Sequence, residues 1–422
     1  MPTSKRLAFG TSLSNRNFRK YAIGQGVSQA GQWVQFVAEV WIILELSDSG
    51  IALGIHSILR FAPILFVGAF TGIIGDRFSR IRVLIITQSL HTISTTTLAI
   101  VVWFTTPTLI LIYGIVLTQG LINAVDNPVR RSFIRDLTTD EELPNAVSLH
   151  SSIGTVTRGI GPVIAGTLIV TVGIAWCFAI NAASYVAVLV SLIIIDRKKL
   201  RESHAAPAGK GQIRAGFRYA KAGRTIRVTL IMSAVMGISA WQWNVILPVY
   251  ATEEFGGNAQ LFGYLVFAFS LGSFMGAVYT ARLARHGGHH LRVTGALLAV
   301  ALTIVAVAPV LPVAFAGLWL LGGAGASFII GAQSRLQLAV EDEMTTRVMA
   351  LYSVAFTGSK PIGGIIAGLV IDVSGSRAAL ALGAVMAGTA TWVYSLDRRR
   401  RDRTRAQTLP SKDVALEPNI DL

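Results

Sequence analysis

Residues 145–169 read NAVSLHSSIGTVTRGIGPVIAGTLI, and residues 347–371 read RVMALYSVAFTGSKPIGGIIAGLVI. The two stretches share residues at a constant offset of 202, among them Leu149 and Leu351, Ser151 and Ser353, Gly161 and Gly363, and Gly166 and Gly368. Each stretch follows a matching acidic pair, at 140–141 and at 342–343. A repeat of this kind predicts two parallel halves with the same order of helices and a central site between them.

The composition predicts an integral membrane protein. Hydrophobic residues make up 52% of the 422 residues and charged residues 14%, whereas soluble domains carry about 25% charged residues. The formal net charge is +15, but the basic residues fall in short loops between apolar spans, which argues against nucleic acid as a partner. A single cysteine, Cys177, excludes an internal disulfide and a cysteine-based metal site, and no cofactor is expected.

Twelve segments are apolar over roughly the 20 residues that a helix needs to cross a bilayer. They are 21–46, 51–75, 83–104, 109–127, 146–172, 173–195, 228–251, 260–281, 293–310, 312–332, 348–372 and 377–396. A long polar gap at 196–227 divides them into six and six. The expected fold class is therefore an all-α integral membrane protein, whose twelve transmembrane helices form two pseudo-symmetric six-helix bundles at 21–195 and 228–396.

Lysines and arginines gather in alternate loops, with clusters at 77–82, 130–135, 197–227 and 398–401. The loops on the opposite side hold almost nothing basic beyond Arg377. This asymmetry predicts that both termini are cytoplasmic. The segments expected on that side include an N-terminal segment at 1–20, a central loop at 196–227 and a disordered basic tail at 397–422.

The repeat pairs Arg158 with Lys360, so each half places one cation near the middle of its fifth helix. An ionisable group at that depth costs at least ~2.5–3.5 kcal/mol on insertion scales. One interpretation is that each cation holds the fold through an interhelical salt bridge or a carbonyl clamp. The other is that both line the cavity and favour anionic or polar cargo, although the membrane carboxylates suit cationic drugs equally.

The first span carries a run of polar residues, QGVSQAGQWVQFVAEVW at 25–41. At roughly 100° per residue, an arc of about 120° contains Gln25, Ser28, Gln29, Gln32, Gln35 and Glu39. A lipid-facing amide would leave its donors and acceptors unpaired, so this stripe must face protein or water. It is either a polar seam between helices or the wall of an aqueous pathway, and its length favours the pathway.

Glu39 lies about seven residues from the outer end of the first span, and Arg60 lies about as far into the second. The two residues are therefore expected at equal depth, where they can pair. A membrane carboxylate suits proton transfer because burial favours its neutral form while a neighbouring cation favours its ionised form. Glu39 is a candidate for proton coupling, and the alternative is a permanent ion pair.

Asp126 lies at the end of the fourth span in DNPVRR, where Pro128 is expected to stop the helix. It is a second candidate for proton coupling, or else part of a cytoplasmic latch.

In the seventh span, WQWNV places aromatic and polar side chains together at mid-membrane, which suits a bulky amphipathic solute. The cavity and substrate candidates are Gln29, Gln32, Gln35, Arg60, Arg158, Trp241, Gln242, Trp243, Asn244 and Lys360.

Two motifs resemble those of the major facilitator superfamily. The loop GIIGDRFSRIR resembles the family signature at Gly72, Asp76, Arg77, Arg80 and Arg82, with Ser79 in place of a glycine and Ile81 in place of a basic residue. The resemblance implies that Asp76 and Arg77 hold the outward-open state through charge contacts with helix ends. TRGIGPVIAG is similar to the family's antiporter motif at Gly161, Pro162 and Gly166, where small residues permit close helix packing.

The run from DNPVRR to TRGIGPVIAG, followed by FAINAASYVAVLVSL, resembles the enterobactin-exporter-like branch, which contains siderophore and multidrug exporters. The resemblance implies a secondary active transporter, not an enzyme, that exports small amphipathic molecules by proton-coupled alternating access. Its expected partners are a small-molecule substrate, protons and membrane lipids, and it is expected to be a monomer in the cell membrane. Two alternatives stay open: an uptake or lysolipid-moving transporter, and a membrane receptor that binds without transporting.

Overall fold

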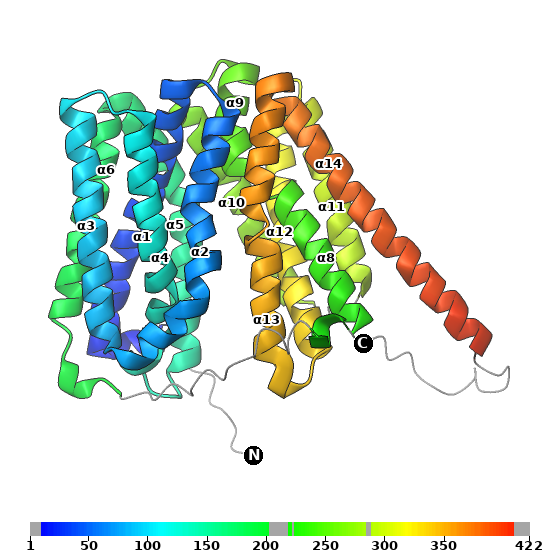
Figure 1. The fold of residues 1–422 in the computed structure, drawn as a ribbon, viewed down its shortest axis with the longest axis horizontal. Coiled ribbons are helices and arrows are strands. Elements are labelled where there is room, and N and C mark those ends of the chain that lie inside the picture. Colours follow the sequence, from blue (N-terminus) through cyan, green and yellow to red (C-terminus); the bar gives the residue numbers. More distant parts are fainter. Residues whose placement is uncertain (1–9, 202–217, 222, 284–287, 409–422) are drawn as a thin grey trace. The chain divides into compact units, whose positions relative to one another are not determined.

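The computed structural model describes residues 10–201, 218–221, 223–283 and 288–408, without the side chains at 65, 67–77, 342–343, 346 and 397–408. Helices make up almost all of this chain (Figure 1). The first six long helices are α1 (Arg16–Ser47), α2 (Gly50–Arg77), α3 (Arg80–Phe104), α4 (Leu109–Leu137), α5 (Leu143–Thr171) and α6 (Ile174–Ile193). The later helices are α8 (Arg224–Ser239), α9 (Trp243–Phe255), α10 (Ala259–Ala281), α11 (Gly288–Val307), α12 (Leu311–Leu338), α13 (Asp342–Thr357) and α14 (Lys360–Thr408). Two short 3-10 turns are η1 (Thr11–Ser14) and η2 (Arg197–Lys199).

The chain folds as two compact units. Unit 1 contains Met1–Gly209 and Leu247–Phe267, and unit 2 contains Lys210–Ile246 and Ala268–Leu422. In unit 1, α1 packs against α5 and α6, α3 packs against α4 and α6, and α2 packs against α4. In unit 2, α8 packs against α13 and α14, while α11 packs against α12 and α14. The division into bundles at 21–195 and 228–396 stays a prediction. The two compact units have different bounds, since the segment at 247–267 groups with unit 1.

Glycines explain how α10, part of which lies in that segment, packs closely against α5 within unit 1. A Cβ atom added to Gly263 of α10 would lie 3.0 Å from the carbonyl carbon of Pro162 on α5. A Cβ atom added to Gly166 would lie 2.7 Å from the Cα atom of Gln260. The two backbones approach this closely only because neither glycine carries a side chain.

Each predicted span coincides for most of its length with one helix or with two consecutive helices. Nine stretches of the described residues are long and apolar enough to cross a membrane. The helix α1 is not among the nine, and it is the helix that carries the polar stripe; α2 contributes only a shorter apolar stretch, Gly50–Ile64. The stretch Arg347–Leu396 contains the last two predicted spans. They are separated at Gly375, whose φ of 83° is a conformation that glycine adopts readily.

Two helices extend further than the sequence predicts. Pro128 does not end its helix, and α4 continues to Leu137. Proline removes one backbone hydrogen bond, but the residues that follow it pack into the core of unit 1, which offsets the loss. The tail expected to be disordered from 397 is helical to Thr408, since extending an existing helix needs no new nucleus and arginine is a good helix former. Residues 409–422, and most of the central loop, lie outside the described residues.

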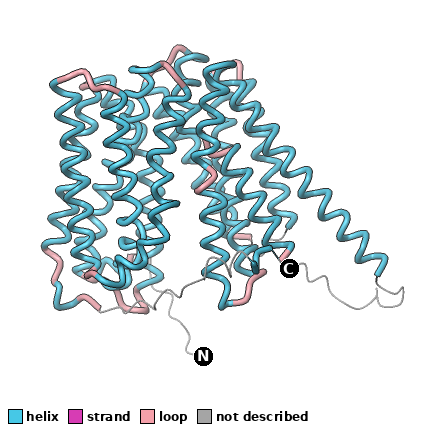
Figure 2. Tube along the Cα trace, in the orientation of Figure 1, coloured by secondary structure: helices cyan, strands magenta, loops and turns pink. Residues whose placement is uncertain are grey.

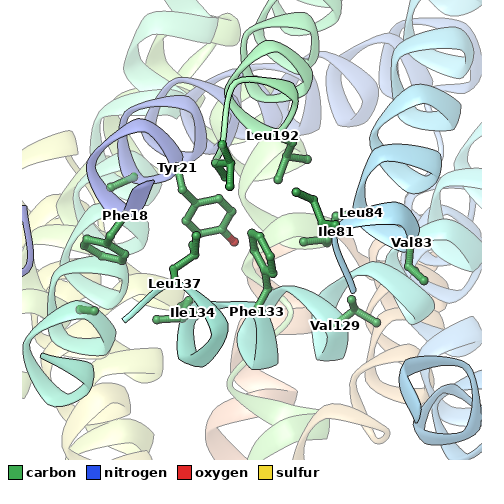
Figure 3. Close-up of a cluster of buried hydrophobic side chains, with 13 residues drawn as sticks. Phe18, Tyr21, Ile81, Val83, Leu84, Val129, Phe133, Ile134, Leu137 and Leu192 are labelled. Atoms are coloured by element: carbon green, nitrogen blue, oxygen red, sulfur yellow. The ribbon is translucent and has the colours of Figure 1, made fainter. Parts of the chain in front are cut away.

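A buried apolar cluster closes one end of unit 1 (Figure 3). It gathers side chains from the start of α1 and α3 and from the end of α4 and α6. Figure 3 shows the rings of Tyr21 and Phe133 close together, and their centroids lie 5.5 Å apart in an edge-to-face arrangement. Phe18, Leu84 and Leu192 fill the space around them, each 1% exposed. This cluster fixes the helix ends from which the polar side chains of unit 1 project.

Unit 2 contains two interrupted helices, and Figure 2 shows pink loop segments that interrupt helices part-way along their length. The first interruption lies between Ser239 and Trp243, and the second lies between Thr357 and Lys360. Pro361 accounts for the second, because it lacks the N–H that would bond to the Thr357 carbonyl and its ring clashes with that carbonyl. In unit 1, α5 runs through the corresponding position, Arg158, without a break.

Candidate functional site

Glu39 is the centre of a buried polar cluster in unit 1. It lies on α1 and is 0% exposed. Its Oε2 atom accepts a hydrogen bond from Arg60 Nη1 of α2 at 2.6 Å and lies 3.1 Å from His56 Nε2. Its Oε1 atom accepts from Gln35 Nε2, one turn earlier on α1, at 2.5 Å. The pair that Glu39 and Arg60 were expected to form on the grounds of equal depth is therefore present.

Gln35 connects this cluster to three other helices. Its Nε2 atom donates to Gln119 Oε1 of α4 at 2.9 Å. Its Oε1 atom accepts from Thr95 Oγ1 of α3 at 3.0 Å and from Asn181 Nδ2 of α6 at 2.5 Å. All four side chains are buried. Because each bond is made away from water, the network holds α1, α3, α4 and α6 in one register.

The rest of the α1 stripe divides into buried and partly exposed positions. Gln25 and Ser28 are buried, and Gln25 Oε1 accepts from Arg130 Nη1 at 2.7 Å. Gln29 and Gln32 are partly exposed, and Gln32 Nε2 donates to Ser28 Oγ at 3.0 Å. In this structure Gln25 and Gln35 belong to a seam between helices. An aqueous pathway along the stripe stays a prediction.

Asp126 is a second completely buried carboxylate, and it lies on α4. Its Oδ2 atom accepts from the guanidinium of Arg130, one turn later on the same helix, with Nε at 2.7 Å and Nη2 in contact. Its Oδ1 atom accepts from Thr87 Oγ1 at 2.6 Å and from Gln88 Nε2 at 2.8 Å, both on α3. Arg130 is 6% exposed, whereas its neighbour Arg131 is exposed.

The repeat-related cations both lie against aromatic rings. The Cζ atom of Arg158 lies 5.5 Å from the centroid of the Trp33 ring on α1. The Nζ atom of Lys360 lies 5.1 Å from the ring of Phe356 and 5.9 Å from that of Trp241. Contacts of this kind stabilise a cation by about 0.5–2 kcal/mol. A role for either cation in lining a cavity stays a prediction.

The candidates at 241–244 lie at the interruption between α8 and α9. The Trp241 ring packs edge-on against Phe356 and Phe269, with centroids 5.0 and 6.4 Å away. The Trp243 ring lies 5.9 Å from Phe269. Gln242 and Asn244, between and after these rings, are both buried. Rings and amides therefore lie together within unit 2, and their role in binding a bulky amphipathic solute stays a prediction.

The family-like loop is described in part. Arg80 Nη1 donates to Asp136 Oδ1 at 2.5 Å, which ties the start of α3 to the end of α4. Arg82 is exposed. The side chains of Asp76 and Arg77 lie outside the described residues, so their role in holding a conformation stays a prediction, as does the part of Gly72 in the motif.

The antiporter-like motif of α5 is a packing surface. A Cβ atom on Gly161 would lie 2.5 Å from the Cβ atom of Trp33 on α1. Pro162 and Gly166 form the close crossing with α10 described above. The close helix packing that the resemblance implies is therefore observed on two sides of α5. Within the described residues, no group of three His, Cys, Asp or Glu side chains is placed to hold a metal ion.

Several members of the two clusters are missed by sequence reasoning. His56, Gln119 and Asn181 are among them, although each has a polar residue at helical spacing on its own helix. Arg60 follows His56 by four residues, Asn123 follows Gln119 by four, and Ser184 follows Asn181 by three. On α3 a signal exists, because Thr87, His91 and Thr95 recur at four-residue intervals and all are buried. That spacing defines a polar face, which packs between the Asp126 and Glu39 clusters.

Residues 9–421 match the transmembrane secretion effector family of the major facilitator superfamily. The chain belongs to this family. Its members are secondary transporters rather than enzymes. This transmembrane secretion effector is therefore a multi-pass membrane protein that takes a small-molecule substrate.

The relatives whose names state an activity are distant in sequence. The staphyloferrin A transporter of Staphylococcus aureus is 27% identical over 61% of this chain, and the match spans 65% of that relative's length. The multidrug efflux pump Tap of Mycolicibacterium fortuitum is 23% identical over 83% of this chain and 88% of its own.

Solved structures show the same fold at low identity. A bacterial homologue of the human lysosomal transporter Spinster, inward-facing and unoccupied, gives a TM-score of 0.71 at 16% identity, covering 92% of this chain and 97% of its own. The nucleoside transporter NupG gives a TM-score of 0.72 at 13% identity, covering 90% of this chain and 98% of its own. These likenesses establish the major facilitator fold of all-α transmembrane helices.

Proposed function

We propose that this transporter exports small amphipathic molecules in exchange for protons, with Glu39 as the proton carrier. The observation that carries the proposal is the Glu39 cluster, where a completely buried carboxylate on α1 pairs with a cation on α2. Protonation of such a carboxylate changes the attraction between the two helices that hold the pair. Proton binding is thereby linked to helix position, which alternating access requires.

Protonation of Glu39 removes the charge that holds Arg60. The Cζ atom of Arg60 also lies 4.9 Å from the Phe36 ring, and its side chain is 18% exposed. The guanidinium therefore has a second partner, the Phe36 ring, when the carboxyl is neutral. The cluster thus has two charge states with different helix contacts, and a substrate that binds one state better shifts the equilibrium between them.

His56 gives the proton a route within the cluster. Its Nε2 atom lies 3.1 Å from Glu39 Oε2, and the residue is 0% exposed. An imidazole at this distance either donates a hydrogen bond to the carboxylate or exchanges a proton with it. Gln35 keeps the other carboxylate oxygen bonded to α1 itself, so the helix-to-helix contact depends on the oxygen that Arg60 and His56 share.

The Asp126–Arg130 pair has a different task in this proposal, that of a latch. Both residues lie on α4, so their attraction does not depend on the position of a second helix. The bonds from Thr87 and Gln88 fasten α3 to the same carboxylate. A fully bonded carboxylate of this kind holds structure and needs no change of protonation in the cycle.

Export is supported by the name of one relative, a multidrug efflux pump, and a small organic cargo is supported by that name and by the name of a siderophore transporter. The antiporter-like motif of α5 supports exchange rather than uptake. The distribution of lysine and arginine supports cytoplasmic termini and a place in the cell membrane. An uptake or lipid-moving transporter would move its solute in the opposite direction or within the bilayer, and a receptor would bind without turnover.

Inverted membrane vesicles, acidic inside, test the proposal. Dyes, drugs and siderophores are offered outside, and accumulation is measured with and without a protonophore. The wild type is compared with Glu39→Gln and with the matched control Glu45→Gln. Glu45 lies on the same helix and is exposed, and glutamine keeps an oxygen that can accept from Trp41 Nε1.

We expect at least one compound to accumulate in the wild type and in Glu45→Gln, to stop accumulating with the protonophore, and to fail in Glu39→Gln. Accumulation that ignores the protonophore would contradict proton coupling. Saturable binding without accumulation would favour the receptor. Gradient-driven loss of a compound from vesicles loaded with it beforehand would favour uptake.

A further inference from the structure

The two helix interruptions of unit 2 touch each other. A Cβ atom on Gly363 of α14 would lie 2.8 Å from Ile238 Cα of α8 and would contact the side-chain nitrogen of Gln242. A Cβ atom on Gly237 would lie 3.3 Å from the carbonyl carbon of Phe356. The helices α9 and α14 therefore begin beside one another, within stretches that are apolar enough to span a membrane.

Positive potential gathers where these two helices begin. The N-terminus of a helix carries unpaired N–H groups and a partial positive charge of about half an elementary unit. Lys360 is the first residue of α14, and its ammonium lies beside the rings of Phe356 and Trp241. Interrupted transmembrane helices often present such N-termini to the anionic group of a substrate.

Two buried amides at the start of α9 point to a ligand. Asn244, in the first turn of α9, is 6% exposed, and its Nδ2 atom has no hydrogen-bond partner among the described residues. Gln242 is 2% exposed; its Nε2 atom donates to the Gly237 carbonyl at 2.8 Å, but its Oε1 atom has no such partner. Buried polar atoms are nearly always bonded, so an unbonded donor and acceptor mark a place where another molecule completes the bonds.

We propose that this break cluster, made of Trp241, Gln242, Asn244, Phe356 and Lys360, binds the anionic group of an organic molecule that has a flat apolar body. The inference names the substrate class of the transporter and so rests on the proposed function. The ammonium and the two helix N-termini attract the anion, and the Asn244 amide donates to it. The aromatic rings supply a flat apolar surface for the rest of the molecule.

The proposal is tested by binding without a proton gradient, on the full-length protein in phosphatidylcholine nanodiscs. The probes are 2-naphthoate and its neutral and cationic counterparts, 2-naphthalenemethanol and 2-naphthylmethylamine. Dissociation constants are measured by calorimetry against empty nanodiscs. We expect naphthoate to bind about tenfold or more tightly than either counterpart, since a hydrogen bond to a charged group has that effect.

Variants locate the binding. Lys360→Gln is expected to weaken naphthoate binding about tenfold and Lys360→Arg to retain it. Asn244→Leu, which keeps the volume and removes the donor, gives a second reading if Lys360→Gln folds poorly. The control is Arg292→Gln, which removes a cation of α11 whose guanidinium lies 2.9 Å from His289 Nδ1.

The proposal is overturned if the three probes bind equally, if none binds, or if Lys360→Gln and Asn244→Leu both bind naphthoate as the wild type does. An anionic lipid headgroup has the same chemistry as a dissolved anion. Loss of naphthoate binding in nanodiscs with phosphatidylglycerol supports the site with a lipid as its occupant, and unchanged binding supports it with a solute. If naphthoate binds but no compound accumulates in vesicles under a proton gradient, the site stands and the proposed exporter is rejected. If compounds accumulate but naphthoate does not bind, only the site is rejected.

Discussion

Unit 1 buries two carboxylates completely, Glu39 and Asp126, whereas in unit 2 the carboxylates with described side chains, Glu341 and Asp372, are both exposed. The contrast extends to the repeat-related helices. In unit 1, α5 runs unbroken past Arg158, while in unit 2 the equivalent helix is interrupted directly before Lys360. Two halves that share a repeat have therefore acquired different chemistry.

The difference teaches how the two proposed tasks are divided. A buried carboxylate paired across two helices can take up a proton and change a helix contact, and this arrangement is found in unit 1. Interrupted helices expose backbone N–H groups in an apolar surrounding, which suits an anionic solute, and these are found in unit 2. Each prediction below tests one side of this comparison.

The largest effect is expected from Arg130→Gln. Removing this cation leaves Asp126 buried without its ion-pair partner, which costs about 3–5 kcal/mol of folding free energy. The thermal unfolding midpoint in detergent should fall sharply, and the double variant Asp126→Asn/Arg130→Gln should recover most of the loss. Arg131→Gln, at an exposed neighbouring position, is the control. A double variant no more stable than the single one would contradict a buried ion pair.

A smaller effect is expected in unit 2 from Gly363→Ala. The new methyl group meets the backbone of Ile238, which cannot move aside as a side-chain end can, so the overpacking should cost about 1–3 kcal/mol. The thermal midpoint should fall and naphthoate binding should weaken. Gly388→Ala is the control, because its nearest neighbour, Ala299 Cβ, lies 3.7 Å from the added atom. Equal thermal midpoints for the two variants would contradict the close contact between the two helix interruptions.

The smallest effect is expected from Thr95→Val. The substitution keeps the shape of the side chain and removes one of the two donors that the structure gives Gln35 Oε1, at a cost of about 0.5–1.5 kcal/mol. It also removes the acceptor of a longer bond from Gln119 Nε2, at 3.4 Å. Thr97→Val is the control, since the Thr97 hydroxyl is exposed and bonds within its own helix. Chemical denaturation of the two purified variants measures the difference, and equal stabilities would show that the network does not hold α3.

Sequence reasoning predicts the spans and the Glu39–Arg60 pair because both follow from one-dimensional rules, apolar length and depth along a helix. The same rules fail at Pro128, where packing after the proline decides the outcome, and at residues 397–408, which continue a helix already formed. Local propensity does not carry either piece of information.

The candidate site is predictable only in part for a related reason. Gln35 is identified by its place in a stripe, but its partners Gln119 and Asn181 lie 84 and 146 residues away. Polar spacing within one helix does not show which other helix it packs against. The interruption before Lys360 is hidden as well, because the repeat aligns Lys360 with Arg158, which lies inside an unbroken helix. Tertiary contacts create both features.

The central claim is that Glu39 carries the proton, and two transport assays on Glu39→Gln in proteoliposomes test it most directly. One assay measures accumulation driven by a proton gradient, and the other measures exchange of labelled for unlabelled compound across the membrane without a gradient. Exchange needs binding and alternating access but no net proton movement. The account predicts that the variant loses gradient-driven accumulation and keeps exchange near the wild-type rate. Loss of both activities would make Glu39 a structural residue, and retention of both would show that another group carries the proton.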